Sequence, residues 1–293
     1  MTKFFLLLSL FFILSHYAFA QSDGKNQIQN REWPDTAKKI RIFKGIRIIN
    51  AETNETLKKH ILDFRVTHLF GNMGKESGGG FHDFFGFDQS KDIRIAFDYG
   101  ITDWWTISVS RSKRHENLEA SGKFKIIEQA IDKAPLAISF FANITYSTIT
   151  KTTFQVYKPS NRYTYAAQIM IARKFSARFS FEIVPCYVHR NLLFDSTDKN
   201  DLLALGGGFR WRFTKHTSFI ADYFFTPKVN GLTYPRHNPL GAGVEIESGG
   251  HLFLVMLTNA SGILENDYIP NTTDSWRHGG YKFSFIISRL FKL

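Results

Sequence analysis

The residues whose types and spacing best suit a chemical function are charged side chains that recur at every second position in otherwise apolar segments. Asp63 and Arg65 form one such pair, and Arg210 and Arg212 form another. In an extended strand, residues two apart point to the same face, so their charges act together. Such a face could line a polar passage and select solutes by charge, or its charges could form a salt-bridged plug that fills the lumen of a narrow barrel. The candidate lining residues, seven basic and six acidic, are Asp63, Arg65, Arg94, Asp98, Lys123, Lys125, Glu182, Arg210, Arg212, Asp222, Glu245, Glu247 and Lys282.

Patterns for catalysis and for metal binding are weak by comparison. A membrane hydrolase needs a serine beside a histidine, and His189 and Ser196 are the nearest candidates, without an acidic partner that the sequence places next to them. The segment 115–119 (HENLE) lacks the second histidine of a zinc-protease motif. No Lys-Ser or Lys-Thr follows Gly78-Gly79-Gly80, so a phosphate-binding loop is not indicated. We therefore expect no catalytic, metal or cofactor site, and a lipid hydrolase is only the second alternative.

The elements that would position these charges are β-strands. Period-two alternation recurs along the chain, whereas long amphipathic helical patterning is almost absent. In 136–147, for example, Ala137, Ser139, Phe141, Asn143 and Thr145 share one face. The predicted strands are about 60–70, 92–99, 104–111, 120–127, 136–147, 162–173, 178–189, 202–213, 217–227, 240–248, 251–259 and 280–291.

The lengths of the connections indicate how these strands assemble. Long connections (71–91, 112–119, 148–161, 190–201, 228–239 and 260–279) alternate with shorter ones (100–103, 128–135, 174–177, 214–216 and 249–250). Outer-membrane barrels have short periplasmic turns and longer external loops, whereas a β-sandwich has no reason to separate them in this way. The sequence therefore predicts an all-β fold, a closed antiparallel transmembrane β-barrel of about twelve strands. Fourteen strands would follow if 43–50 joined the wall.

Composition agrees with a barrel in lipid. The chain holds 30 Phe, 11 Tyr and 5 Trp, which suits a lipid-facing surface with aromatic girdles. Arg or Lys facing lipid at the midplane would cost ~2–4 kcal/mol each, so the charged faces must point inward. The net charge of +11 fits anionic lipid headgroups or an anion-attracting lumen. Export makes a nucleic-acid partner unexpected, and the single cysteine, Cys186, permits no intrachain disulfide.

The N-terminus carries the features of a secretory signal peptide. Lys3 precedes an apolar run from Phe4 to Leu14, and Ala18-Phe19-Ala20 forms a small-x-small cleavage site before Gln21. We expect residues 1–20 to be removed after Ala20. Residues 21–58 would form a periplasmic tail, a plug in the lumen or an extra short strand, with the tail favoured for 21–38. Residues 59–293 would form the barrel.

The loop 71–91 joins Gly78-Gly79-Gly80 to Phe81, Phe84, Phe85 and Phe87. It could fold inward as a constriction or ligand-binding loop. The favoured interpretation is a flexible loop whose phenylalanines pack on the barrel rim.

Several segments resemble an uncharacterised outer-membrane β-barrel family of Bacteroidota. They are Leu57 to Gly71, Gly78 to Asp103, Pro185 to Asn191, Gly243 to Thr273, and Ile287 to Phe291. The resemblance covers most of the chain after about residue 43. It implies a barrel fold and an outer-membrane location, and it supplies neither a substrate nor a catalytic residue.

These observations predict a pore or channel for a small polar solute in the bacterial outer membrane. The first alternative is a structural or docking protein of the envelope with a plugged lumen. Expected partners are outer-membrane lipid and lipopolysaccharide, the barrel assembly machinery during insertion, and the solute itself.

Overall fold

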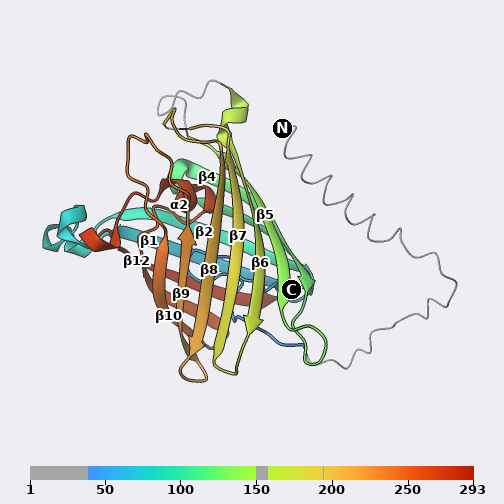
Figure 1. The fold of residues 1–293 in the computed structure, drawn as a ribbon. Coiled ribbons are helices and arrows are strands. Elements are labelled where there is room, and N and C mark those ends of the chain that lie inside the picture. The colour runs from blue at the N-terminus through green and yellow to red at the C-terminus, as the bar shows by residue number, and fades with distance from the viewer. Residues whose placement is uncertain (1–38, 150–157, 194) are drawn as a thin grey trace. The chain divides into compact units, whose positions relative to one another are not determined.

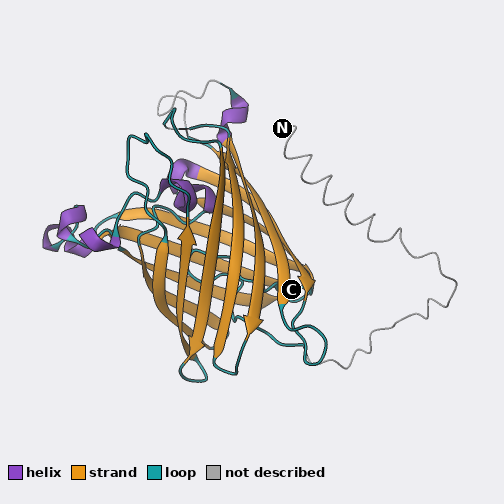
Figure 2. Ribbon diagram, in the orientation of Figure 1, coloured by secondary structure: helices purple, strands orange, loops and turns teal. Residues whose placement is uncertain are grey.

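The computed structural model describes residues 39–149, 158–193 and 195–293, which form a closed antiparallel barrel (Figures 1 and 2). The predicted signal peptide, 1–20, lies outside the described residues. The twelve strands of the described chain are β1 Ile61–Asn72, β2 Ser90–Thr102, β3 Trp105–Ser112, β4 Asn117–Ile127, β5 Ala137–Ser147, β6 Tyr163–Lys174, β7 Phe179–Arg190, β8 Asp201–Arg212, β9 Thr217–Phe225, β10 Leu240–Ser248, β11 His251–Thr258 and β12 Lys282–Lys292.

Each strand pairs with its neighbours in sequence, and β1 closes the sheet by pairing with both β2 and β12. Val66 lies opposite Ile95 on one side and Ile287 on the other. Closure leaves no free sheet edge. The predicted twelve-stranded antiparallel barrel is confirmed, with strand limits within three residues of those expected. The fourteen-stranded alternative is wrong, because 43–50 forms no strand of the wall.

The connections divide between two ends of the barrel. We call the end with 73–89, 113–116, 148–162, 191–200, 226–239 and 259–281 the long-loop end, and the end with 103–104, 128–136, 175–178, 213–216 and 249–250 the short-turn end. The predicted alternation of long and short connections fails at one place. The connection 113–116, at the long-loop end, has only four residues, whereas 128–136, at the short-turn end, has nine. Strand β4 begins at Asn117, earlier than expected, because Asn117 and Glu119 continue the buried face of that strand.

Helical turns of the described residues lie in the connections. They are η1 Lys75–Ser77, η2 Phe81–Gly86, η3 Arg114–Glu116, η4 Pro159–Arg162, α2 Glu265–Asn271 and η5 Trp276–His278. Of the helices in the described ranges, none combines the length and the apolar character needed to span a bilayer.

The outer surface of the barrel is apolar. Large apolar side chains on the outward faces of the strands are exposed, among them Ile95, Phe97, Val109, Ile169, Ile183, Leu203, Leu205, Val255 and Ile287. Aromatic rings add to this band near the short-turn end, where Trp104, Phe175, Trp211 and Phe213 are each more than half exposed. A soluble monomer rarely exposes so large a contiguous apolar surface. The surface has the character of one that faces lipid.

We expect the cost of a charge on this surface to depend on depth. Val109→Arg, in the middle of β3, should destabilise the folded barrel by ~2–4 kcal/mol, whereas Ile126→Arg, near the short-turn end, should cost ~0–1 kcal/mol. Urea unfolding of both variants in lipid vesicles measures the difference. Equal costs at the two positions would contradict a lipid-facing band centred on the middle of the strands.

Candidate functional site

The thirteen charged residues picked out by the sequence lie on the inward faces of the strands. Ten of them are at most 6% exposed: Asp63, Arg65, Arg94, Asp98, Lys123, Glu182, Arg210, Asp222, Glu245 and Lys282. Lys125, Arg212 and Glu247 are half-buried near the short-turn end. Side chains that line a water-filled channel would be exposed to water. Because these ten are buried, no such channel runs past them in this conformation. Their partners are two segments inserted into the barrel.

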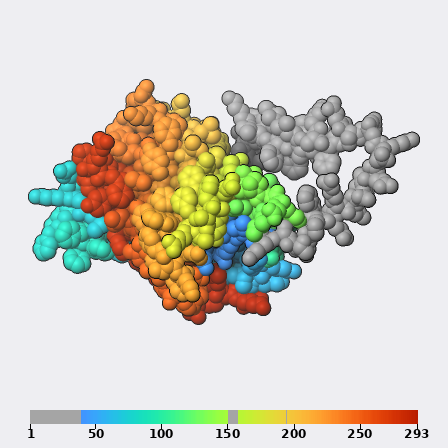
Figure 3. Space-filling view, turned by 60° about the horizontal axis from the view of Figure 1, so that its bottom comes forward, coloured from blue at the N-terminus to red at the C-terminus, as the bar shows by residue number. Residues whose placement is uncertain are grey.

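The first inserted segment is residues 39–57, which we call the lumen hairpin. It starts at the short-turn end, where the Ile40 N–H donates to the Gln129 carbonyl at 2.9 Å. It reverses inside the barrel, where the Ile48 N–H donates to the Ala51 carbonyl at 3.0 Å. It returns to the short-turn end, where Leu57 precedes β1. Figure 3 shows the blue beginning of the described chain lodged among the elements at this end.

Charged groups of the wall hold the hairpin through its backbone. The Lys123 ammonium donates to the carbonyls of Ile46 at 2.6 Å and Thr53 at 3.0 Å, and it pairs with Glu52 at 2.7 Å. On the opposite side of the hairpin, the Asp222 carboxylate accepts hydrogen bonds from the Asn50 N–H at 2.5 Å and the Ala51 N–H at 2.8 Å. The hairpin's buried polar backbone is thus satisfied by charges that the sequence predicted to line the lumen.

Two glycines of the wall make room for the hairpin's tip. A Cβ atom at Gly208 would lie 2.4 Å from Ile48 Cδ1, and one at Gly241 would lie 2.5 Å from Ile49 Cγ2. Both distances are well below an ordinary contact. The inner wall is therefore shaped to fit this segment.

The second inserted segment is residues 259–272, which we call the loop insert. It enters from the long-loop end and contains α2, six of whose seven residues are buried. Tyr268 is fully buried and packs edge-on against Phe224, with the ring centroids 5.1 Å apart. The Gln168 amide donates to its hydroxyl at 3.4 Å.

Arg47 joins the two inserts inside the barrel. Its guanidinium pairs with Glu265 of the loop insert at 2.9 Å and with Glu52 of its own hairpin at 3.3 Å. It also donates to the Ile263 carbonyl at 2.9 Å. The side chains of Arg47, Glu52 and Glu265 are at most 3% exposed.

The interior is polar on one side and apolar on the other. The inward residues of β3 are Thr106, Ser108, Ser110 and Ser112. Apolar inward residues of β6 to β9 and β11, which lie beside buried charges such as Glu182 and Asp222, form a hydrophobic core with the two inserts. This core includes Met170, Val184, Val188, Ile220, Phe224 and Leu254 from the wall, Ile42, Phe43, Ile48 and Ile49 from the hairpin, and Tyr268 and Ile269 from α2.

The hydrolase candidates are not brought together. The His189 ring nitrogens contact Asp201 at 2.8 Å and Asn191 at 2.9 Å, and no contact joins His189 to Ser196 among the described residues. The described ranges also hold no cluster of three or more His, Cys, Asp or Glu side chains that could bind a metal ion.

The loop after β1 does not constrict the lumen. Its phenylalanines face outward, with Phe81 85% and Phe84 62% exposed. Phe87 packs on Phe70 and Phe283 at the rim, with ring centroids 5.2 and 5.1 Å apart. Rim packing therefore holds for Phe87 and not for the tip of the loop.

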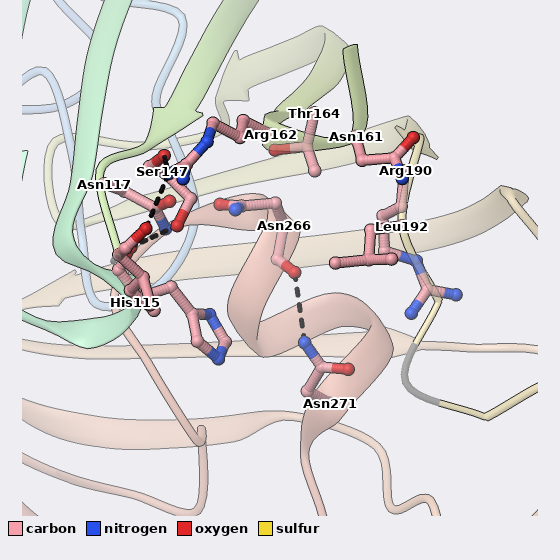
Figure 4. A pocket seen from close by; sticks show the side chains of 11 residues that line it. His115, Asn117, Ser147, Asn161, Arg162, Thr164, Arg190, Leu192, Asn266 and Asn271 are labelled. Atoms are coloured by element: carbon pink, nitrogen blue, oxygen red, sulfur yellow. Dashed lines mark hydrogen bonds between the residues drawn. The ribbon is translucent and has the colours of Figure 1, made fainter. Parts of the chain in front are cut away.

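A pocket of about 60 Å³, which we call the vestibule pocket, lies between α2 and the long-loop ends of β4 to β7 (Figure 4). Among the described residues, no carboxylate lines this pocket. Asp267 lies nearby and contacts the His115 ring at 2.8 Å. The lining residues are His115, Asn117, Ser147, Ile149, Asn161, Arg162, Thr164, Arg190, Leu192, Asn266 and Asn271.

One carboxylate beside the pocket serves two arginines. Asp198 accepts from Arg190 at 2.8 Å and from Arg236 at 2.7 Å. Burial alone would raise the pKa of Asp198, but the hydrogen bonds from Arg236 and Arg190 hold its pKa below the usual value. Asp198 therefore stays ionised at neutral pH, with two cations on one anion.

Sequence reasoning did not identify the loop insert or the vestibule pocket. Arg47 and Glu52 lie in a segment for which a plug was one of three interpretations, and the alternation Ile46-Arg47-Ile48 was the local sign of structure there. Glu265 and Asn266 lie in what was predicted to be loop. No local pattern marks them as partners of residues in the barrel.

Comparison with known proteins agrees with the barrel. Residues 43–291 match the family described as "Membrane bound beta barrel domain (DUF5777)". Among curated proteins, none matches this sequence.

Solved structures similar to the chain include the NanC porin, with 11% identity, a TM-score of 0.47 and coverage of 79% of this chain and 100% of that one. A KdgM porin in complex with disordered oligogalacturonate is 8% identical, with a TM-score of 0.46 and coverage of 80% of this chain and 99% of that one. The CymD monoaromatic hydrocarbon channel is 9% identical, with a TM-score of 0.40 and coverage of 81% of this chain and 89% of that one. Similarity at this level says nothing about what this protein binds. The family match spans most of the chain, and the protein therefore belongs to the DUF5777 family of membrane-bound β-barrel domains.

Proposed function

We propose that this protein is an outer-membrane β-barrel that passes a small polar solute only when the lumen hairpin is displaced. In the conformation described above, the inserts occupy the interior. Passage therefore requires a second conformation, and the hairpin is the segment best placed to move.

The observation that carries this proposal is the path of the hairpin. It enters and leaves the barrel at the same short-turn end, between the bond of Ile40 to Gln129 and the bond of Leu57 to Thr106. Besides apolar packing, the hairpin is held by hydrogen bonds that involve side chains and by one isolated bridge at Lys39 and Ala130, where the Ile40 N–H donates to the Gln129 carbonyl. The hairpin could thus withdraw without breaking any strand pairing of the barrel.

The wall behind the hairpin offers a polar path. The inward residues of β1 to β4 are largely charged or hydroxylated, and Asp63, Arg65, Asp98 and Lys123 lie among them. With the hairpin withdrawn, water would solvate these groups, and their charges would favour polar solutes over apolar ones.

A second candidate function is a permanently closed barrel that acts as a docking or structural protein of the envelope. Apolar packing favours it. Displacing the hairpin would expose Ile42, Phe43, Ile48 and Ile49 together with the apolar wall against which they pack. Opening must overcome this loss of burial, which amounts to ~1.5–3 kcal/mol for each such side chain that becomes fully exposed.

A disulfide across the hairpin's tip separates the two functions. We expect Ile49→Cys with Gly241→Cys, in a Cys186→Ala background, to form a disulfide, because the side chains at 49 and 241 are in contact range. In a planar bilayer, the oxidised protein should show no conductance, and reduction should restore the openings of the wild type. Openings that persist in the oxidised protein would exclude the hairpin as the gate.

Loosening the junction between the inserts should open the barrel more often. Arg47→Ala leaves Glu265 without its cation, and breaking such a buried pair costs ~3–5 kcal/mol. If part of that cost falls on the closed state, the fraction of time spent open should rise at least tenfold, because ~1.4 kcal/mol is a tenfold change.

The matched control is Lys44→Ala, whose pair with Glu247 has side chains 34% and 40% exposed. Such a pair is worth only ~0–1 kcal/mol, so the open fraction should change little. If the wild type, the reduced cysteine variant and Arg47→Ala are all silent, although heat-modifiable gel mobility shows them to be folded, the docking function is favoured.

A further inference from the structure

We propose that the vestibule pocket is a binding site for a small hydroxycarboxylate, which it takes from the long-loop side of the barrel. The pocket is positively charged, and it contains buried polar atoms that have no protein partner. Its size admits a group of only a few heavy atoms.

Two atoms of the lining lack partners. Asn266 is 7% exposed, yet its Oδ1 accepts no hydrogen bond within the described chain. Arg190 is 4% exposed, and its Nε is likewise unpartnered among the described residues. Figure 4 shows the Asn266 side chain directed from α2 toward Arg162. Buried polar groups are nearly always paired with protein, water or ligand, so each of these open atoms calls for a partner in the pocket.

The charge of the pocket selects an anion. Arg162 donates to the carbonyls of Ser147 and Ile149, each at 2.7 Å, and in the described ranges it has no carboxylate partner. Arg190 shares Asp198 with Arg236, which leaves one positive charge in excess. Carboxylate is, with phosphate, one of the two anionic groups that guanidinium donors bind in a bidentate manner.

The open acceptor on Asn266 adds a second requirement. A simple carboxylate offers no donor to Asn266 Oδ1, whereas a hydroxyl group beside the carboxylate does. A cavity of about 10–15 Å³ already holds one water molecule, so a pocket of about 60 Å³ has room for a carboxylate with its adjacent hydroxyl. The ligand class is therefore a small hydroxycarboxylate, or the hydroxycarboxylate end of a larger molecule.

This inference deepens the proposed function. It rests on that function in one respect only, namely that the ligand of the pocket is taken to be the transported solute. Binding is measured on the refolded barrel with the hairpin in place. Failure of the gate and failure of the binding site can therefore be told apart.

The experiment is calorimetric titration of the refolded full-length barrel with glycolate, acetate and acetamide. We expect glycolate to bind about tenfold more tightly than acetate, and acetamide not to bind. Arg162→Gln should weaken both anions about tenfold. Asn266→Leu, which keeps the size of the side chain but removes its acceptor, should abolish the preference for glycolate while leaving acetate binding unchanged.

Either of two results would overturn the proposal. One is binding of glycolate no tighter than that of acetamide. The other is an undiminished preference for glycolate in Asn266→Leu. Should Asn266→Leu fail to fold, as judged by gel mobility, Arg162→Gln decides alone, because Arg162 lies at the half-buried rim and equal affinity for glycolate in this variant would exclude the site. Titration with glucuronate then distinguishes a free small acid from the end of a sugar, because only an open-ended site binds both.

Discussion

The closed interior depends on the ion pairs of Arg47. This side chain lies in the lumen and is only 1% exposed, so its charge must be compensated within the protein. Glu52 and Glu265 compensate it, and each carries the network further. Glu52 pairs with Lys123 of β4. Glu265 accepts from Asn143, which also donates to Glu119, the partner of Arg94. Three cations and three anions are thereby linked, and the wall residues among them and Asn143 lie on the nearby strands β2, β4 and β5.

That network explains how a barrel of this size can be closed. Eight strands enclose a space that wall side chains fill, whereas twelve leave a gap that something else must occupy. Here the hairpin and the loop insert fill it, one from each end. The apolar half of the wall packs on Ile48 and Tyr268 as in a soluble core, and the polar half supplies charges to the hairpin's backbone. The sheet therefore separates lipid from a protein core rather than lipid from water.

The strands of the wall could be predicted from the sequence, whereas the contacts of the inserts inside the barrel could not. Alternation such as Asp63-Phe64-Arg65 defines both a strand and its two faces, and each hairpin joins neighbours in sequence, so register and order follow from local information. The inserts follow no local rule. Arg47 meets Glu265 across 218 positions, and nothing in either segment specifies the other. The identity of the inward charges was local information, whereas the identity of their partners was not. The same residues therefore fitted a channel or a salt-bridged plug equally well on sequence alone.

Helix α2 contacts both the lumen hairpin and the vestibule pocket. Three consecutive residues at its start have three different partners: Glu265 binds Arg47 of the hairpin, Asn266 lines the pocket, and Asp267 contacts His115 at the rim. A ligand on Asn266 that shifts α2 must therefore alter the pair that holds the hairpin. If ligand binding shifts the equilibrium between the two states of the hairpin by some factor, linkage requires the ligand's affinity to differ between those two states by the same factor. A solute bound on the long-loop side would in this way act on a segment that opens toward the short-turn side, through the displacement of one short helix.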